Sequence, residues 1–163
     1  MARIERATLA DVPDVKRVLS ETWTATYGSF LSAEAIQQVT SVWHAPDRLA
    51  RQAGNPQVFL GVARLDGPSI VGMVTVRHRD TGTVMVDRLY VLPIHQRQGV
   101  GDALLRAGLA AFPGSRRARL DVEEQNRIGR TFWQKQGSSE VGRRVERVAG
   151  AVLEMVEMEK APV

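Results

Sequence analysis

The chain has 163 residues, a formal net charge of +4, and 44% hydrophobic and 25% charged residues. This length predicts one domain over residues 1–163, which is large enough to bury a stable core without disulfides or a structural metal. Because the sequence contains no cysteine, it excludes disulfides, thiolate metal sites and a cysteine-bound acyl intermediate.

The N-terminal segment lacks an apolar signal core, and no apolar run approaches the ~18 residues that span a bilayer. We therefore expect a cytoplasmic protein with no membrane partner, either a monomer or a homodimer. No aromatic-rich strand or basic recognition helix accompanies the arginine clusters, so nucleic-acid binding is disfavoured and attraction to one anionic ligand is expected instead. The clusters are Arg116, Arg117 and Arg119, and Arg143, Arg144 and Arg147.

The first part of the chain predicts a short strand at residues 3–6, followed by helices. Apolar residues recur at helical spacing after Asp11, which can cap a helix with Pro13 in its first turn. A second helix is expected from Ser32, and Pro46 opens a short third helix or turn.

The middle of the chain changes to short apolar runs separated by turn residues, a pattern typical of strands. Farther along, helical and strand patterns alternate. The order β-α-α-β-β-β-α-β-α-β-β predicts an α/β domain with one mixed sheet and helices on both faces. The expected strands are 58–63, 70–79, 84–92, 118–123, 141–145 and 152–158, and the later helices are 101–112 and 127–136.

The most informative segment is a basic loop with two glycines, which leads from a strand into a helix. A helix N-terminus exposes unpaired N–H groups and a partial positive charge, so it binds phosphate, and glycine lets the backbone approach closely. The pattern also fits a plain helix start with two incidental glycines. Leu104 replaces the third glycine of a dinucleotide fingerprint, and no Walker Gly-Lys-Ser/Thr follows. The loop reads Gln96-Arg97-Gln98-Gly99-Val100-Gly101.

This loop resembles the Gln/Arg-x-x-Gly-x-Gly/Ala motif of the GCN5-related N-acetyltransferases (GNATs). Leu89-Tyr90-Val91-Leu92-Pro93 is similar to the strand that precedes that motif. Residues 120–126, followed by residues 131–137, are similar to the second signature of the family. The resemblance covers nearly the whole chain in element order and implies a GNAT-like mixed sheet.

The resemblance implies acetyl-CoA as co-substrate and gives each motif a role. The backbone of Leu89, Tyr90 and Val91 would pair with pantetheine, and an N–H near Val91 would polarise the thioester carbonyl. Asn126 would contact the pantetheine arm. The pyrophosphate would be held by the loop, which comprises Gln96, Arg97, Gln98, Gly99, Val100, Gly101 and Asp102. No metal is expected, because His44, His78 and His95 lack ligand spacing.

One residue departs from the family pattern. Many GNATs carry a tyrosine, the usual acid for the leaving thiolate, where this chain has Trp133. An indole N–H donates a hydrogen bond but is not a practical acid, so we expect Trp133 to pack beside the cofactor. Tyr90 and Tyr27 are the remaining phenols. Tyr27 also lies in a segment that resembles the acceptor-pocket helix of bacterial acetyltransferases.

The attacking amine must lose a proton, so a base or a water relay is expected. Asp121 occupies the position of an acidic base in a related subgroup that acetylates N-termini, and Asp87 is the second candidate. Glu123 and Glu124 follow them in rank.

We therefore expect an N-acetyltransferase that moves an acetyl group from acetyl-CoA to a primary amine by direct attack. The acceptor would be a small molecule, such as a polyamine, amino acid or antibiotic, or the amine of a peptide or protein. The alternative is a non-catalytic module of the same fold that binds acyl-CoA as a sensor, which Trp133 motivates.

Overall fold

A computed structural model describes residues 1–162, which contain a seven-stranded mixed sheet. The strands are ordered β1-β2-β3-β4-β5-β7-β6, and every neighbouring pair is antiparallel except β4 and β5. The sheet and its connectivity agree with the predicted α/β class. The strands are β1 (Arg3–Arg6), β2 (Val58–Arg64), β3 (Gly72–Asp80), β4 (Thr83–Val91), β5 (Arg117–Glu123), β6 (Ser138–Val148) and β7 (Ala151–Lys160).

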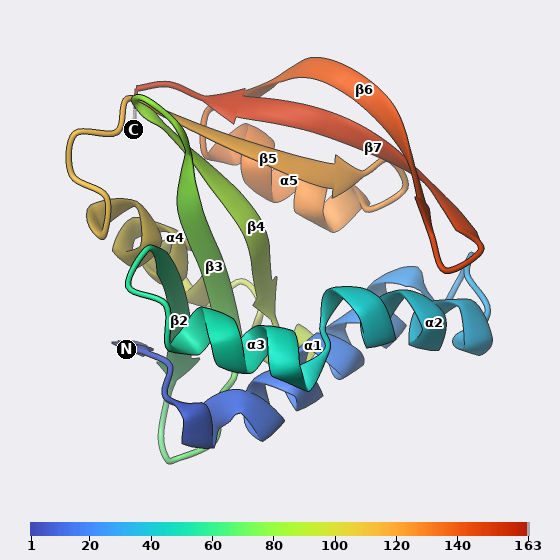
Figure 1. Cartoon of the computed structure of the whole chain (residues 1–163), viewed down its shortest axis with the longest axis horizontal. Coiled ribbons are helices and arrows are strands. Elements are labelled where there is room, and N and C mark those ends of the chain that lie inside the picture. The colour runs from blue at the N-terminus through green and yellow to red at the C-terminus, as the bar shows by residue number, and fades with distance from the viewer. Residues whose placement is uncertain (163) are drawn as a thin grey trace.

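Helices cover both faces of the sheet, as the element order predicts (Figure 1). Helices α1 and α3 pack against one face of the β2–β4 region, and α4 packs against the other. The third element expected at Pro46 is a helix rather than a turn. The helices are α1 (Val12–Tyr27), α2 (Ala33–Trp43), α3 (Pro46–Ala53), α4 (Val100–Ala110) and α5 (Arg127–Lys135). No helix in the described part of the chain is long and apolar enough to span a membrane.

The two C-terminal strands are longer than expected, since 141–145 extends to Ser138–Val148 and 152–158 to Ala151–Lys160. Strand β6 lies at the sheet edge and pairs with β7 over nearly its whole length. Its ends carry charged and small residues that show no strand pattern in the sequence. Pairing with β7, rather than local composition, therefore sets its length.

The pairing of the two parallel strands is short and then stops. Strands β4 and β5 pair from Thr83↔Arg117 to Val86↔Leu120. On its other side, β4 pairs with β3, and the register of this pair shifts at the same point. Val76 faces Val86 and Thr75 faces Arg88, so Asp87 has no partner and forms a bulge. A bulge bends a strand and increases its twist. Beyond it, β4 and β5 diverge into a V (Figure 1).

Two apolar clusters hold the arms of this V. The larger fills the space between the sheet and α1, α3 and α4. The smaller joins α1 and α2 to the β6–β7 hairpin, so it links the two arms at their open end. Each large side chain fully buried there contributes roughly 1.5–3 kcal/mol. The smaller cluster contains Trp23, Tyr27, Ile36, Val39, Val148, Ala151, Leu153 and Met155.

Candidate active site

A cavity of about 970 Å³ lies where β4 and β5 separate. On one side it is lined by the loop before α4 and by α5, and on the other by residues of α1, α3 and the end of α2. These helices cover opposite faces of the sheet. The cleft therefore lets two ligands meet between the strands from opposite faces, in the crevice beyond the carboxyl ends of two parallel strands.

The loop before α4 has the backbone geometry of an anion site. Arg97 and Gly99 have φ of 62° and 81°, and Gly99 is the N-cap of α4. Within residues 1–162, no backbone N–H from Arg97 to Asp102 donates a hydrogen bond to another residue. The side chain of Gln96 donates to the carbonyl oxygen of Val91 at 3.0 Å, which ties the loop to the end of β4. Free N–H groups at a helix N-terminus are suited to a phosphate.

The two motif glycines serve different purposes. A Cβ at Gly99 would have no atom within 4 Å, so the positive φ is what demands glycine there. A Cβ at Gly101 would lie 3.2 Å from Cε1 of Phe132 on α5. Glycine at position 101 therefore lets α4 and α5 approach each other, and a side chain there would press on the Phe132 ring.

Asn126 stands at the N-terminus of α5 on the same cleft. Its Oδ1 accepts a hydrogen bond from the backbone N–H of Gly129 at 2.9 Å, which caps the helix. The side-chain amide of Asn126 also lies within hydrogen-bonding reach of the Tyr27 hydroxyl across the cleft. Arg127 and Lys135 of α5 add positive charge along the cleft.

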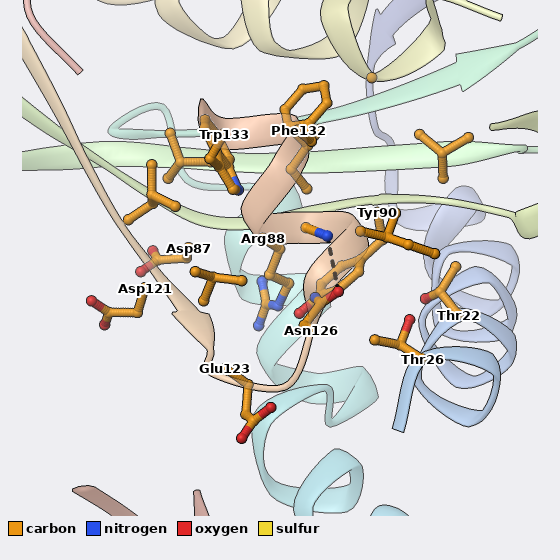
Figure 2. A pocket seen from close by; sticks show the side chains of 18 of the residues that line it. Thr22, Thr26, Asp87, Arg88, Tyr90, Asp121, Glu123, Asn126, Phe132 and Trp133 are labelled. Carbon is orange, nitrogen blue, oxygen red and sulfur yellow. Dashed lines mark hydrogen bonds between the residues drawn. The ribbon is translucent and has the colours of Figure 1, made fainter. Parts of the chain in front are cut away.

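Both aspartates expected as bases are engaged by arginines. Asp87 accepts hydrogen bonds from Nε and Nη2 of Arg77 at 2.6 and 3.2 Å. Asp121 accepts one from Nη2 of Arg144 at 2.5 Å, and Arg144 also contacts Glu146. A guanidinium that occupies carboxylate oxygens leaves less room for an incoming amine. Figure 2 shows both aspartates at one side of the cleft.

From the sequence, Glu123 is placed after the two aspartates as a candidate base, yet Glu123 is more deeply buried than either of them. It ends β5 with 4% of its surface exposed and lines the cleft. Its Oε2 accepts a hydrogen bond from the N–H of Gln125 at 2.7 Å. Burial raises the pKa of Glu123 above its ordinary value. No arginine or lysine pairs with Glu123 in the described chain, and a carboxylate in this state is a stronger base.

The two tyrosines lie on the α1 side of the cleft. Burial raises the pKa of Tyr90 and raises that of Tyr27 well above its usual range, so both phenols keep their protons at neutral pH. Tyr27 is 3% exposed and packs against Trp23, with ring centroids 4.3 Å apart. Tyr27 therefore combines core packing with a place in the cleft lining.

Trp133 is 6% exposed and belongs to the larger apolar cluster. Its ring packs edge-on against Phe132, with centroids 5.2 Å apart, and it lines the cleft. This environment is that of a packing residue at the wall of the cleft.

Sequence reasoning did not single out Arg88, which lines the centre of the cleft (Figure 2). The available signal was its register, because Arg88 lies two positions before Tyr90 and so shares its face of the strand. His44, which is 2% exposed, lines the same region and was considered only as a metal ligand. Within the described residues, no cluster of three or more His, Cys, Asp or Glu is arranged to hold a metal ion.

Comparison with known families identifies the family of the chain. The model of the acetyltransferase (GNAT) family matches residues 15–137, which include both motifs and all of β2 to α5. The chain belongs to the GNAT acetyltransferase family. The expected family is therefore confirmed, and with it acetyl-CoA as the acyl donor.

Solved GNAT structures share this fold over their whole length. The PaiA N-acetyltransferase of Thermoplasma acidophilum, in complex with coenzyme A, has a TM-score of 0.80 at 23% identity, with 99% of each chain covered. A GCN5-related N-acetyltransferase from Rhodopseudomonas palustris has a TM-score of 0.82 at 21% identity, with 99% and 96% covered. The ribosomal-protein-S18-alanine N-acetyltransferase of Escherichia coli has a TM-score of 0.72 at 15% identity, with 99% and 94% covered. No curated protein sequence matches this GNAT chain significantly.

The conformation at Gly99 predicts a defect in acetyl-CoA binding on substitution. Gly99→Ala places a Cβ at a φ that costs a non-glycine residue roughly 1–2 kcal/mol, so the loop should shift its free N–H groups. We expect acetyl-CoA affinity to fall at least about tenfold, measured by calorimetry on the folded variant. Gly67→Ala is the matched control, since it has open space and no positive φ. Unchanged affinity in a folded Gly99 variant would remove the loop from the binding site.

The burial of Trp133 predicts that its size matters more than its indole N–H. Trp133→Ala should lower the free energy of unfolding by about 3–5 kcal/mol, measured by urea denaturation. Trp133→Tyr should fold and bind acetyl-CoA. Its turnover should differ from that of the wild type by no more than about tenfold, because the only new chemical group is the phenol. A tyrosine variant that binds acetyl-CoA but loses most turnover would show that the indole has a specific catalytic role.

Proposed function

We propose that this protein transfers the acetyl group of acetyl-CoA to a primary amine, which attacks the thioester directly. One observation carries the proposal: a single cleft joins a loop of unpaired N–H groups at α4 to a buried carboxylate, Glu123, where β4 and β5 part. An anion-binding loop and a base are the two parts that such a transfer needs from the protein.

The separation of β4 from β5 supports the proposed position of the acetyl-CoA arm. Beyond Val86, the edge of β4 has no strand beside it on the β5 side. An extended, amide-containing arm can pair with such an edge as an added strand. The backbone from Leu89 to Val91 would hold pantetheine, while the N–H groups from Arg97 to Asp102 would hold the pyrophosphate.

The proposed chemistry needs one proton removed and one supplied. The amine nitrogen forms a bond to the thioester carbonyl carbon, the C–S bond breaks, and the sulfur takes a proton. Since the chain has no cysteine, we propose direct attack without an acyl-cysteine. Glu123 would accept the proton of the amine, with Asp121 and Asp87 as rival bases. Tyr90 or water would protonate the thiolate.

The activity itself is tested by coenzyme A release from acetyl-CoA with a mixed panel of primary amines. The panel contains amino acids, polyamines, an aminoglycoside and peptides with a free N-terminus or a lysine. We expect release with at least one class, at a rate that depends on amine concentration. Tight acetyl-CoA binding in calorimetry without release from any amine would favour the sensor alternative.

The raised pKa of Glu123 predicts a pH-dependent rate. The ionised form accepts the proton, so kcat/KM should rise with pH through the raised pKa of Glu123 and then level off. Glu123→Gln should lower turnover by roughly 10²-fold and leave acetyl-CoA affinity intact. Asp121→Asn and Asp87→Asn are the paired comparisons, and a larger loss in either would transfer the base role to that residue.

Glu123→Gln, which should lower turnover, should raise the free energy of unfolding at neutral pH. A carboxyl whose pKa is higher in the folded than in the unfolded state destabilises folding once it ionises. Glu123→Gln should therefore be more stable than the wild type at neutral pH. The difference should disappear as the pH falls below the ordinary glutamate pKa, which urea denaturation at several pH values would measure.

A further inference from the structure

Arg88 is a buried cation whose partners in the described chain are all neutral. It is 6% exposed and comes from β4. Its Nη1 donates to Oε1 of Gln52 at 2.6 Å and to Oγ1 of Thr75 at 3.1 Å, and its Nη2 donates to the carbonyl oxygen of Trp43 at 2.7 Å. Its Nε–H and the second Nη2–H have no acceptor within residues 1–162. Buried charges in proteins are normally paired.

The acid next to Arg88 in the chain is already engaged by another arginine. Asp87 is the adjacent residue, but both of its oxygens accept bonds from Arg77. Burial, and then the charge of Arg48, lower the pKa of Arg88 to about 10. Arg88 nevertheless stays charged at neutral pH and lines the cleft.

The surroundings of Arg88 add further positive charge and two buried polar atoms without partners. Burial, then Arg88, Lys16 and Arg48, hold the pKa of His44 well below its usual range, so its imidazole is neutral. Nδ1 of His44 and Nε1 of Trp23 are buried without a hydrogen-bond partner among residues 1–162. Both residues line the cleft beside Arg88.

The carboxylates of the cleft are mostly engaged elsewhere. Asp121 and Glu146 contact Arg144, and Asp102 pairs with Arg106 at 2.6 Å. Glu123, which the transfer would use, has no basic partner in the described chain. The α1 side of the cleft therefore presents a cation and unpaired polar atoms to whatever enters it. A polycationic acceptor would be repelled there, whereas an anion would supply the missing partner.

We propose that the acceptor is a small amine that also carries a carboxylate, such as a free amino acid, and that Arg88 binds this carboxylate. The inference rests on the proposed acetyl transfer and names its substrate class. The free N–H groups of Arg88 lie on adjacent guanidinium nitrogens, and two donors so arranged suit the two oxygens of a carboxylate. The carboxylate would hold the acceptor on the α1 side, with its amine directed toward the thioester between the strands.

The test compares each acid with its own amide. The substrates are glycine, L-serine, L-methionine, L-phenylalanine and β-alanine, each beside its carboxamide, with spermidine as the polycation. The amine of an α-carboxamide is less basic than that of its acid, so more of it is neutral and reactive. A preference for the acid therefore cannot come from amine protonation. We expect kcat/KM at least about tenfold higher for the preferred acid than for its amide.

A binding measurement separates this inference from the proposed activity. In the presence of coenzyme A, the N-acetyl derivative of each acid and of its amide is titrated by calorimetry, which needs no turnover. At least about tenfold tighter binding of an N-acetyl acid supports the carboxylate site even in a protein that releases no coenzyme A. Equal binding or equal kcat/KM for acid and amide in every pair, or a preference for spermidine, would overturn it.

Two variants tie the effect to the guanidinium. Arg88→Lys keeps the positive charge but removes the pair of adjacent donors, so it should erase most of the acid-over-amide preference while acetyl-CoA affinity is retained. Arg48→Gln removes another cation of the same cleft and should keep most of that preference. An Arg88→Lys variant that binds acetyl-CoA and keeps the full preference would contradict the assignment. If this variant does not fold, the wild-type comparisons still decide.

Discussion

The parallel pairing of β4 and β5 runs only from Thr83↔Arg117 to Val86↔Leu120, and the rest of the site depends on its ending there. The bulge at Asp87 bends β4 at the point where the pairing with β5 ends. Separation leaves the edge of β4 from Leu89 to Val91 without a strand neighbour, and it opens a passage between the two faces of the sheet. Had the ladder continued to Val91, its backbone would be occupied and the two sides of the cleft would not meet.

Keeping two strands apart inside a sheet requires support on both arms, and the apolar clusters provide it. Helix α4 lies so close to β3 that a Cβ at Gly108 would come 2.7 Å from Cγ2 of Val76. At the open end, Trp23 and Tyr27 of α1 join a cluster with Leu153 and Met155 of β7. The aromatic residues thus link the arms across the cleft while their edges line it. A rigid frame of this kind holds two substrates in a fixed geometry.

The charges of the cleft divide into paired and unpaired groups, and the division matches the two proposed ligands. Asp87 and Asp121 are balanced by Arg77 and Arg144. Ion pairs also neutralise part of the positive charge of the cluster at residues 143–147, since Arg143 contacts Glu124 and Glu140. What remains is a run of free N–H groups near α4, the buried Glu123, and the buried Arg88. The N–H groups suit a pyrophosphate, Glu123 suits the proton of an amine, and Arg88 suits a carboxylate.

The sequence by itself determined the family, the loop at residues 96–101 and the order of the elements apart from α3, which it left open as a helix or a turn. These features are local, because helical spacing, turn residues and the glycine motif act within a few positions of the chain. The sequence also predicted that Trp133 packs rather than supplies a proton, and its burial agrees with that reading. The structure adds a distinction between the two motif glycines that the sequence did not make, because Gly99 has a positive φ and Gly101 makes room for Phe132.

Only the tertiary structure decided which of the charged residues are free to act. Asp121 and Arg144 are 23 positions apart, and their strands β5 and β6 flank β7 in the sheet, so no local pattern could show that they pair. The burial of Glu123 and Arg88 depends in the same way on helices and strands distant in the chain. Ionic state and accessibility follow from the summed surroundings of a group. For that reason the sequence could identify the candidate carboxylates, whereas only the fold shows which of them form ion pairs with arginine and which do not.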